Sequence, residues 1–292
     1  MQARSALAPL VFILLAQLSV NAGAAVGKGL FAQAGPEGVA MLRTSIAALI
    51  MFAIARPWRA RLDTAQLGWL ALYGLALGTM NLSIYLALER IPIGIAVAIE
   101  LTGPLAVVLA TSRTRRDFLW LALAVGGVAL LLPWPGHNAP LDPLGIAFAL
   151  GAAACWAGYI LFGKQASRVE GFTAVSMGML FACAVTIPVG LANATAALWQ
   201  PNMLALGAVI AVLSSAIPYA LEMKALGKVS ARVFGVASST APAIAALAGL
   251  VWLGETIGPW QASGIGLVMA ASIGASLTSA PPVSRPREDF HA

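Results

Sequence analysis

Long apolar segments follow one another along almost the entire chain, and only short polar breaks separate them. The hydrocarbon core of a bilayer is about 30 Å thick, so a helix that spans it needs about 20 predominantly apolar residues. Hydrophobic residues make up 60% of the 292 residues and charged residues only 10%, which is unlike any soluble domain of this length. The pattern therefore predicts an all-α polytopic membrane protein.

Ten segments have the length and composition of transmembrane helices. We expect them at residues 8–27, 37–55, 67–88, 92–111, 118–133, 143–162, 171–192, 202–222, 231–253 and 259–279. The first segment also has features of a signal peptide, because a basic start precedes it and an A-x-A-like end follows it. Cleavage there would leave nine spans. Residues 280–292 are expected to form a disordered tail.

The positions of lysine and arginine predict how the helices are oriented. Cytoplasmic loops collect positive charge, and with ten spans and a cytoplasmic N-terminus all but three of the 17 basic residues lie inside. The three exceptions are Lys28, Arg43 and Arg90. Both termini are therefore expected in the cytoplasm. The net charge of +6 then reflects topology and contact with anionic lipid, and no nucleic-acid partner is expected.

The chain contains two copies of one unit, offset by 136 to 138 residues. Gly27-Lys28 aligns with Gly163-Lys164, Thr102 and Pro104 align with Thr240 and Pro242, and further pairs match at the same spacing. We expect one membrane domain made of a first repeat at 1–136 and a second at 137–279. Each copy holds five helices, so the second must cross the membrane in the opposite sense. Such inverted repeats are typical of transporters that work by alternating access.

Several segments resemble a known family. The five-plus-five plan, the "GK" after the first helix of each half and "LGET" after the ninth helix resemble the EamA branch of the drug/metabolite transporter superfamily. "GVAMLRTSIAALI", "GIAVAIELTGPLAVVL" and "AIPYALEMKAL" are similar to the bacterial inner-membrane threonine/homoserine exporters. The resemblance covers roughly residues 10 to 278. It implies a multi-pass protein of the bacterial inner membrane that exports small neutral amino acids, driven by the proton gradient.

Glu100 is the charged residue that most needs an explanation, because it lies near the middle of the apolar segment 92–111. A charge at that depth costs from about 2.5 to more than 10 kcal/mol, so it persists only beside water or a partner. Pro104 has no N–H to donate to the Glu100 carbonyl, which predicts a kink at the acid. Ser238 and Pro242 occupy the same register in the second repeat. Glu100 is expected to bind a substrate ammonium or a proton, and an ion pair with Arg43 is the alternative.

Arg43 is the second intramembrane candidate. Its guanidinium is suited to a substrate carboxylate, because two parallel N–H groups can donate to the two oxygens. The alternatives are a structural ion pair with Glu100 and a position in which the side chain reaches the outer surface.

Other polar and kinked positions complete the candidate site. Glu222 is expected at the inner end of the eighth helix, where it lies either at a gate or at an ordinary position of the membrane–water interface. Pro218 and Tyr219, just before it, suggest a kink and a polar contact. Residues that could line a cavity, or merely bond between helices, are Asn81, Tyr85, Trp156 and Tyr159. Asp117 and Glu255 are expected to cap the fifth and tenth helices at their N-termini.

The sequence offers no catalytic constellation, so no enzyme is expected. "GYILFGKQ" at 158–165 has the spacing of a phosphate loop, but Gln165 stands where Ser or Thr is needed and no strand precedes it. His137 and His291 are the only histidines, which excludes a metal cluster or a histidine-based triad. No metal or cofactor is expected. The expected partners are an amino acid, protons and the lipid bilayer, and a homodimer stays open.

Three functions fit these features. The first is a proton-coupled exporter of threonine, homoserine or similar amino acids by alternating access. The second is an exporter of another small solute on the same fold, such as a drug, a nucleobase or an aromatic amino acid. The third is a membrane packing partner without transport, in which Glu100 and Arg43 merely pair.

Overall fold

The computed structural model describes residues 2–111, 115–131, 141–166, 168–218, 221 and 237–278, and this part of the chain is helical without a β-strand. The longer helices are α1 (Gln2–Lys28), α2 (Phe31–Ala55), α3 (Thr64–Arg90), α6 (Arg115–Leu131), α7 (Pro143–Ala166), α8 (Gly171–Ala192) and α13 (Pro259–Thr278). Shorter helices are α4 (Ile93–Glu100), α5 (Thr102–Thr111), α9 (Pro201–Ala211) and α12 (Ala241–Ala248). Single-turn or π-helical segments are η1 (Pro57–Arg59), η2 (Ala196–Trp199), η3 (Val212–Ala216) and η4 (Gly249–Leu253). The expectation of an all-α fold is confirmed for the described residues.

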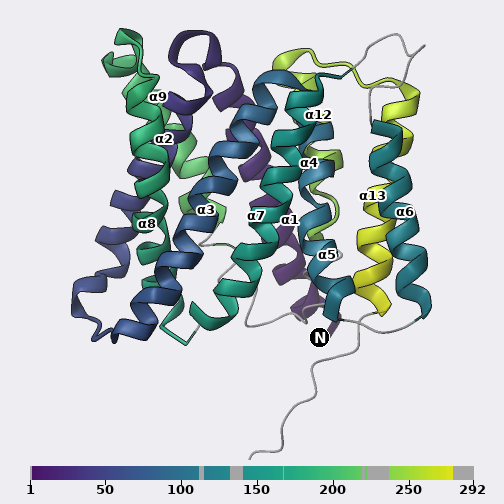
Figure 1. Cartoon of the computed structure of the whole chain (residues 1–292), viewed down its shortest axis with the longest axis horizontal. Coiled ribbons are helices and arrows are strands. Elements are labelled where there is room, and N and C mark those ends of the chain that lie inside the picture. Colours follow the sequence, from purple (N-terminus) through teal and green to yellow (C-terminus); the bar gives the residue numbers. More distant parts are fainter. Residues whose placement is uncertain are drawn as a thin grey trace, which may run out of the picture.

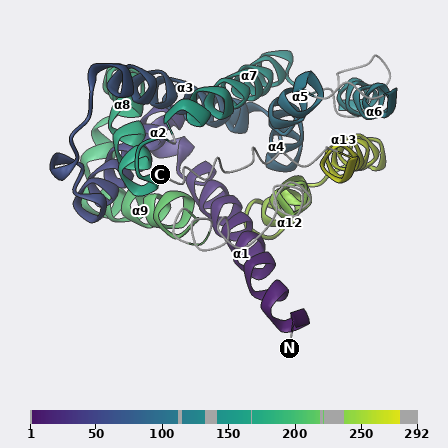
Figure 2. The same ribbon diagram turned by 90° about the horizontal axis from the view of Figure 1, so that it is seen from below.

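Six helices in the described ranges are long and apolar enough to cross a membrane. Shorter apolar helical segments cover Ile93–Val107, Phe118–Leu131, Pro201–Ala216 and Ala241–Leu253. The long helices stand roughly parallel in one bundle, with α6 and α13 side by side at one edge (Figure 1). Seen from below, α1 and α12 lie on one side of the bundle and α3, α5 and α7 on the other (Figure 2).

The predicted helix at 92–111 is divided in the structure. α4 ends at Glu100, Leu101 forms a turn, and α5 begins at Thr102. The Thr102 hydroxyl donates to the Ile99 carbonyl at 2.6 Å. Because Pro104 cannot donate to the Glu100 carbonyl, the regular bonding pattern fails at this point.

The second half of the chain has the same local structure 138 residues later. The Thr240 hydroxyl donates to the Ala237 carbonyl at 2.7 Å, and α12 begins at the next residue, with Pro242 in its first turn. A threonine that bonds its own backbone three residues back, followed by a proline, therefore interrupts a helix in both halves.

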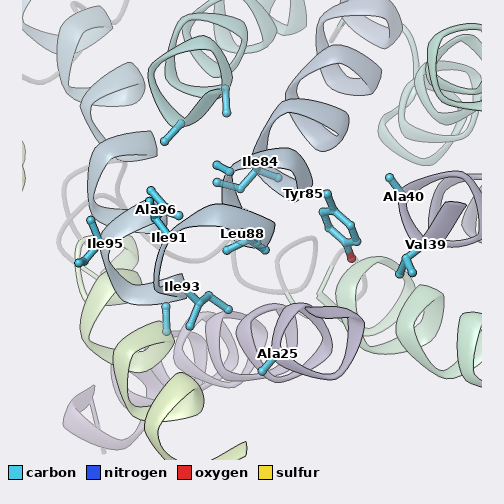
Figure 3. Packing of buried hydrophobic residues seen from close by; sticks show 14 of the residues in the cluster. Ala25, Val39, Ala40, Ile84, Tyr85, Leu88, Ile91, Ile93, Ile95 and Ala96 are labelled. Atoms are coloured by element: carbon cyan, nitrogen blue, oxygen red, sulfur yellow. The ribbon is translucent and has the colours of Figure 1, made fainter. Parts of the chain in front are cut away.

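Glycines let several helices approach one another closely. A Cβ on Gly127 would lie 2.8 Å from the Gly264 carbonyl, and a Cβ on Gly264 would lie 2.9 Å from the Gly127 carbonyl. α6 and α13 thus pack backbone to backbone, as small residues allow in membranes. The main apolar core lies farther in, where α1, α2, α3 and α4 meet (Figure 3).

A kink near the start of α2 was not predicted from the sequence. Gly35 has φ of 68° and ψ of 155°, a conformation outside the helical region, and Pro36 follows it. The segment before this kink was expected to be a loop, since the predicted helix began at residue 37. Hydropathy does not report such a short helical extension.

Candidate substrate site

Glu100 lies at the C-terminal end of α4 and is buried, with 9% of its surface exposed. Helix C-termini carry partial negative charge, so a second negative charge there is unfavourable without a proton or a cation. Arg43 on α2 is the cation that interacts electrostatically with Glu100. The ion pairs of the described residues include neither side chain, so the two are near each other without direct contact.

Arg43 instead has two weaker partners. Its Nη2 donates to the Ser214 carbonyl at 3.3 Å, and its Cζ lies 5.4 Å from the centre of the Tyr85 ring. A cation over an aromatic face is attracted by the electrons of the ring. We call Arg43, Tyr85, Ser214 and Glu100 the Arg43 cluster. It joins α2, α3, η3 and the end of α4.

The Ser214 carbonyl is available to Arg43 because of the local backbone. In a regular helix it would accept from the N–H four residues later, but that residue is Pro218, which has none. The π-helical turn of η3 also frees the preceding carbonyl, that of Leu213, because the Ile217 N–H donates to the Val212 carbonyl instead. The Leu213 carbonyl accepts from the Ser19 hydroxyl at 2.6 Å. Pro218 indicates in the sequence that the carbonyl four residues earlier lacks its usual helical donor. The role of that Ser214 carbonyl as a partner of Arg43 was not predicted.

Tyr85 is almost fully buried, and its phenol has no hydrogen-bond partner among the described residues. The phenol points from α3 toward α1 and α2, which carry Ala25 and Val39 (Figure 3). A Cβ on Gly27 of α1 would lie 3.2 Å from the phenol oxygen. Asn81, also buried, lies one turn earlier on the same face of α3. The hydroxyl of Ser214 is likewise buried without a partner.

Other predicted site residues lie elsewhere. Tyr159 is stacked on Tyr73 with ring centres 4.6 Å apart, and the Tyr73 hydroxyl donates to that of Tyr159 at 3.0 Å. Tyr73 precedes Tyr85 by about three turns of α3, or about 18 Å, so Tyr159 is not part of the Arg43 cluster. Trp156 is half-buried one turn before Tyr159 on α7. Tyr219 and Glu222 lie outside the described residues.

Glu255 does not cap the tenth helix, which corrects our expectation. Its Oε1 lies 2.7 Å from Lys28 Nζ, and its Oε2 accepts from the Ile93 N–H, at the start of α4, at 2.9 Å. Lys28 Nζ also donates to the Ile91 carbonyl at 2.8 Å. We call Lys28, Ile91, Ile93 and Glu255 the Lys28–Glu255 cluster. Glu255 does accept from an N–H at the N-terminus of a helix, but that helix is α4, in the other half of the chain.

Asp117 was the matching expectation in the first half, and it stays a prediction. Among the described residues α6 begins at Arg115, so Asp117 lies near its start. Within the described ranges, no group of three or more His, Cys, Asp or Glu side chains could hold a metal ion.

Comparison with known proteins identifies the family. Residues 143–277 match the EamA-like transporter family. The chain is also 44% identical to the threonine/homoserine exporter RhtA of Escherichia coli (strain K12) over 270 residues, which cover 92% of each chain. The chain belongs to the EamA-like transporter family. It is therefore a multi-pass membrane transporter and not an enzyme.

Other relatives agree with this assignment. The threonine/homoserine exporter RhtA of Salmonella typhimurium (strain LT2) is also 44% identical, with 92% of each chain covered. The uncharacterized transporter YwfM of Bacillus subtilis (strain 168) is 29% identical over 75% of this chain and 69% of its own. One protein of known crystal structure has the same fold, with a TM-score of 0.59 at 18% identity, and the match covers 94% of this chain and 98% of that one.

Proposed function

We propose that this transporter exports small neutral amino acids such as threonine and homoserine across the bacterial inner membrane. Two relatives that are 44% identical over almost the whole chain are named threonine/homoserine exporters. The observation that carries the proposal is the Arg43 cluster, in which a buried acid and a half-buried guanidinium on different helices interact without direct contact. An amino acid carries one charge complementary to each of them.

In this proposal Arg43 binds the substrate carboxylate. Its present partner on η3 is a neutral carbonyl at 3.3 Å, near the long end of the hydrogen-bond range. A carboxylate offers two charged oxygens to the planar guanidinium, and such charge-assisted bonds are about twice as strong as neutral ones. The substrate therefore displaces the Ser214 carbonyl, while the Tyr85 ring keeps the guanidinium in place.

Glu100 binds the substrate ammonium and a proton in turn. A buried carboxylate at a helix C-terminus needs one or the other to balance its charge. Proton entry from the side of higher proton concentration releases the ammonium there, which makes export an antiport with protons. Tyr85 and Asn81 line the same site, and the unpartnered phenol is suited to the hydroxyl that threonine and homoserine share.

We further propose that ten spans form two inverted repeats, at 1–136 and 137–279, with both termini in the cytoplasm. The threonine-proline interruptions at Thr102 and Thr240 support this arrangement, because they lie at equivalent positions of the two halves. The two repeats exchange inward-open and outward-open states around the Arg43 cluster.

Efflux from proteoliposomes tests the function. Purified protein is reconstituted with radiolabelled threonine inside, and the internal and external pH are set independently. We expect efflux to accelerate when the external pH is lowered. We also expect homoserine to inhibit threonine efflux, and a bulky aromatic amino acid or a cationic drug not to inhibit it. Efflux of drugs and not of threonine would favour the other small-solute exporter.

A further inference from the structure

The Lys28–Glu255 cluster joins three segments that are far apart in the sequence. They are the end of α1, the link between α3 and α4, and the turn that follows η4. Both side chains of the pair are mostly buried, with exposed fractions of 18% and 14%. Lys28 bonds a carboxylate and a carbonyl, and Glu255 bonds an ammonium and an amide. Both charged groups therefore have partners, and the cluster connects these three segments at one end of the bundle.

Two glycines make this bridge possible. Gly254 ends η4 with φ of 66°, a left-handed conformation that glycine adopts without strain and that turns the chain back. A Cβ on Gly249 would lie 2.5 Å from Glu255 Oε2 and 2.6 Å from Ile93 Cγ2. The missing side chain at 249 is what lets the carboxylate reach the start of α4.

α4 connects this bridge directly to the candidate site. Ile93 is its first residue and Glu100 its last, and its eight residues form a rod about 12 Å long. A carboxylate at the N-terminus of a helix accepts from its free N–H groups and is favoured by the helix dipole. A displacement of α4 at Ile93 therefore moves Glu100 relative to Arg43, which lies on a different helix.

We propose that Glu255 is a positioning residue for Glu100, and that the Lys28–Glu255 pair opens and closes one end of the bundle in each transport cycle. This rests on the proposed alternating-access export. A pair of charges suits a reversible joint, because both charges regain water when they part and neither is left buried without a partner. When the pair closes, Glu255 fixes α4 and Glu100 in register with Arg43; when it opens, α4 is released.

Reversible crosslinking tests the opening. Cys155 and Cys183 are first replaced by alanine, and K28C and E255C are then introduced and joined with a bifunctional methanethiosulfonate linker. We expect threonine efflux to stop when the linker is added and to return after reduction. Continued efflux from fully crosslinked protein would overturn the proposal.

A matched control lies at the same end of the molecule. Arg90, at the end of α3, pairs with Asp142, directly before α7, at 3.1 Å, and neither belongs to α4 or to the site. The pair R90C and D142C, crosslinked in the same way, is expected to leave efflux unchanged. The two possible failures are distinct, because a cysteine-free parent that exports no amino acid contradicts the proposed function and says nothing against the bridge.

The positioning role has its own readout, the pH profile of efflux. Glu255→Gln keeps an oxygen for the Ile93 N–H and loses the ion pair, whereas Glu255→Ala loses both. We expect Glu255→Ala to shift the pH at which efflux is half-maximal, because Glu100 is no longer held in register, and Glu255→Gln to shift it less. An identical pH profile for wild type and Glu255→Ala would show that Glu255 does not position Glu100.

Discussion

The Lys28–Glu255 cluster and the Arg43 cluster both bring opposite charges together, but they differ in how completely their polar groups are bonded. In the first, each carboxylate oxygen and the ammonium have a partner at 2.7 to 2.9 Å. In the second, the Tyr85 and Ser214 hydroxyls are buried without one, and Glu100 contacts no cation directly among the residues that the structure describes. An unbonded buried polar group costs about 1–3 kcal/mol. Such a cost is expected where a ligand later supplies the bonds.

Glu100→Gln should have the largest effect. We expect threonine efflux under an imposed pH gradient to fall to the level of empty vesicles, because a neutral amide can neither hold the ammonium nor carry the proton. Thermal stability should stay close to that of wild type. Glu89→Gln, at an exposed position on α3, is the control and should export normally. Unchanged efflux in Glu100→Gln would remove this residue from the mechanism.

Arg43→Lys should weaken substrate binding without preventing membrane insertion. A point charge replaces the planar fork and its contact with the Tyr85 ring, so we expect the half-saturating threonine concentration to rise about tenfold, or about 1.4 kcal/mol. The measurement is initial efflux rate against internal threonine. Arg90→Lys, in the exposed pair with Asp142, serves as the control. An unaltered half-saturating concentration would mean that Arg43 does not bind the carboxylate.

Lys28→Met should instead act on stability. It leaves Glu255 charged and mostly buried, with the Ile93 N–H as its remaining partner among the described residues, which costs about 1–3 kcal/mol. For a protein of this size we expect the melting temperature in detergent to fall by several degrees. If Arg43→Lys lowered the melting temperature as much as Lys28→Met does, the distinction between the two clusters would be wrong.

The sequence predicted more of the fold than of these contacts. Hydropathy located the helical segments, because burial in lipid requires uninterrupted apolar runs of known length. Pro104 indicated the interruption beside Glu100. The bond of Glu255 to α4 could not be predicted, since it joins residues 162 positions apart and needs the turn at Gly254 to bring them together. The role of the Ser214 carbonyl depends in the same way on which helix lies opposite Pro218.

Tyr85→Phe tests the comparison at a single hydroxyl. We expect the preference for threonine over 2-aminobutyrate, which lacks the hydroxyl, to fall about fivefold, or about 1 kcal/mol, with no loss of stability because the phenol has no partner among the described residues. Tyr73→Phe is the matched control on the same helix. It removes a hydroxyl that bonds Tyr159 and should lower stability by about 1 kcal/mol without changing the preference. An unchanged preference in Tyr85→Phe would exclude hydroxyl recognition by Tyr85.

Asp142 provides the smallest effect, in the loop before α7. The Leu144 N–H, and then the bond from Arg90, hold the pKa of this carboxyl below its usual value of 3.8. A carboxyl whose pKa is lowered on folding stabilises the fold at pH values above its unfolded pKa. That contribution disappears as the pH falls through the lower folded pKa. We therefore expect Asp142→Asn to be slightly less stable than wild type at neutral pH.

The difference between Asp142→Asn and wild type should close only as the pH falls below 3.8, and melting temperatures measured from pH 7 downward check this. Because the pair is exposed to water, added salt should also shrink the difference at neutral pH. The mostly buried Lys28–Glu255 pair should respond less to salt than Arg90–Asp142 does. Equal salt sensitivity of Lys28→Met and Asp142→Asn would show that the bridge at α4 is no better shielded from water than a surface pair.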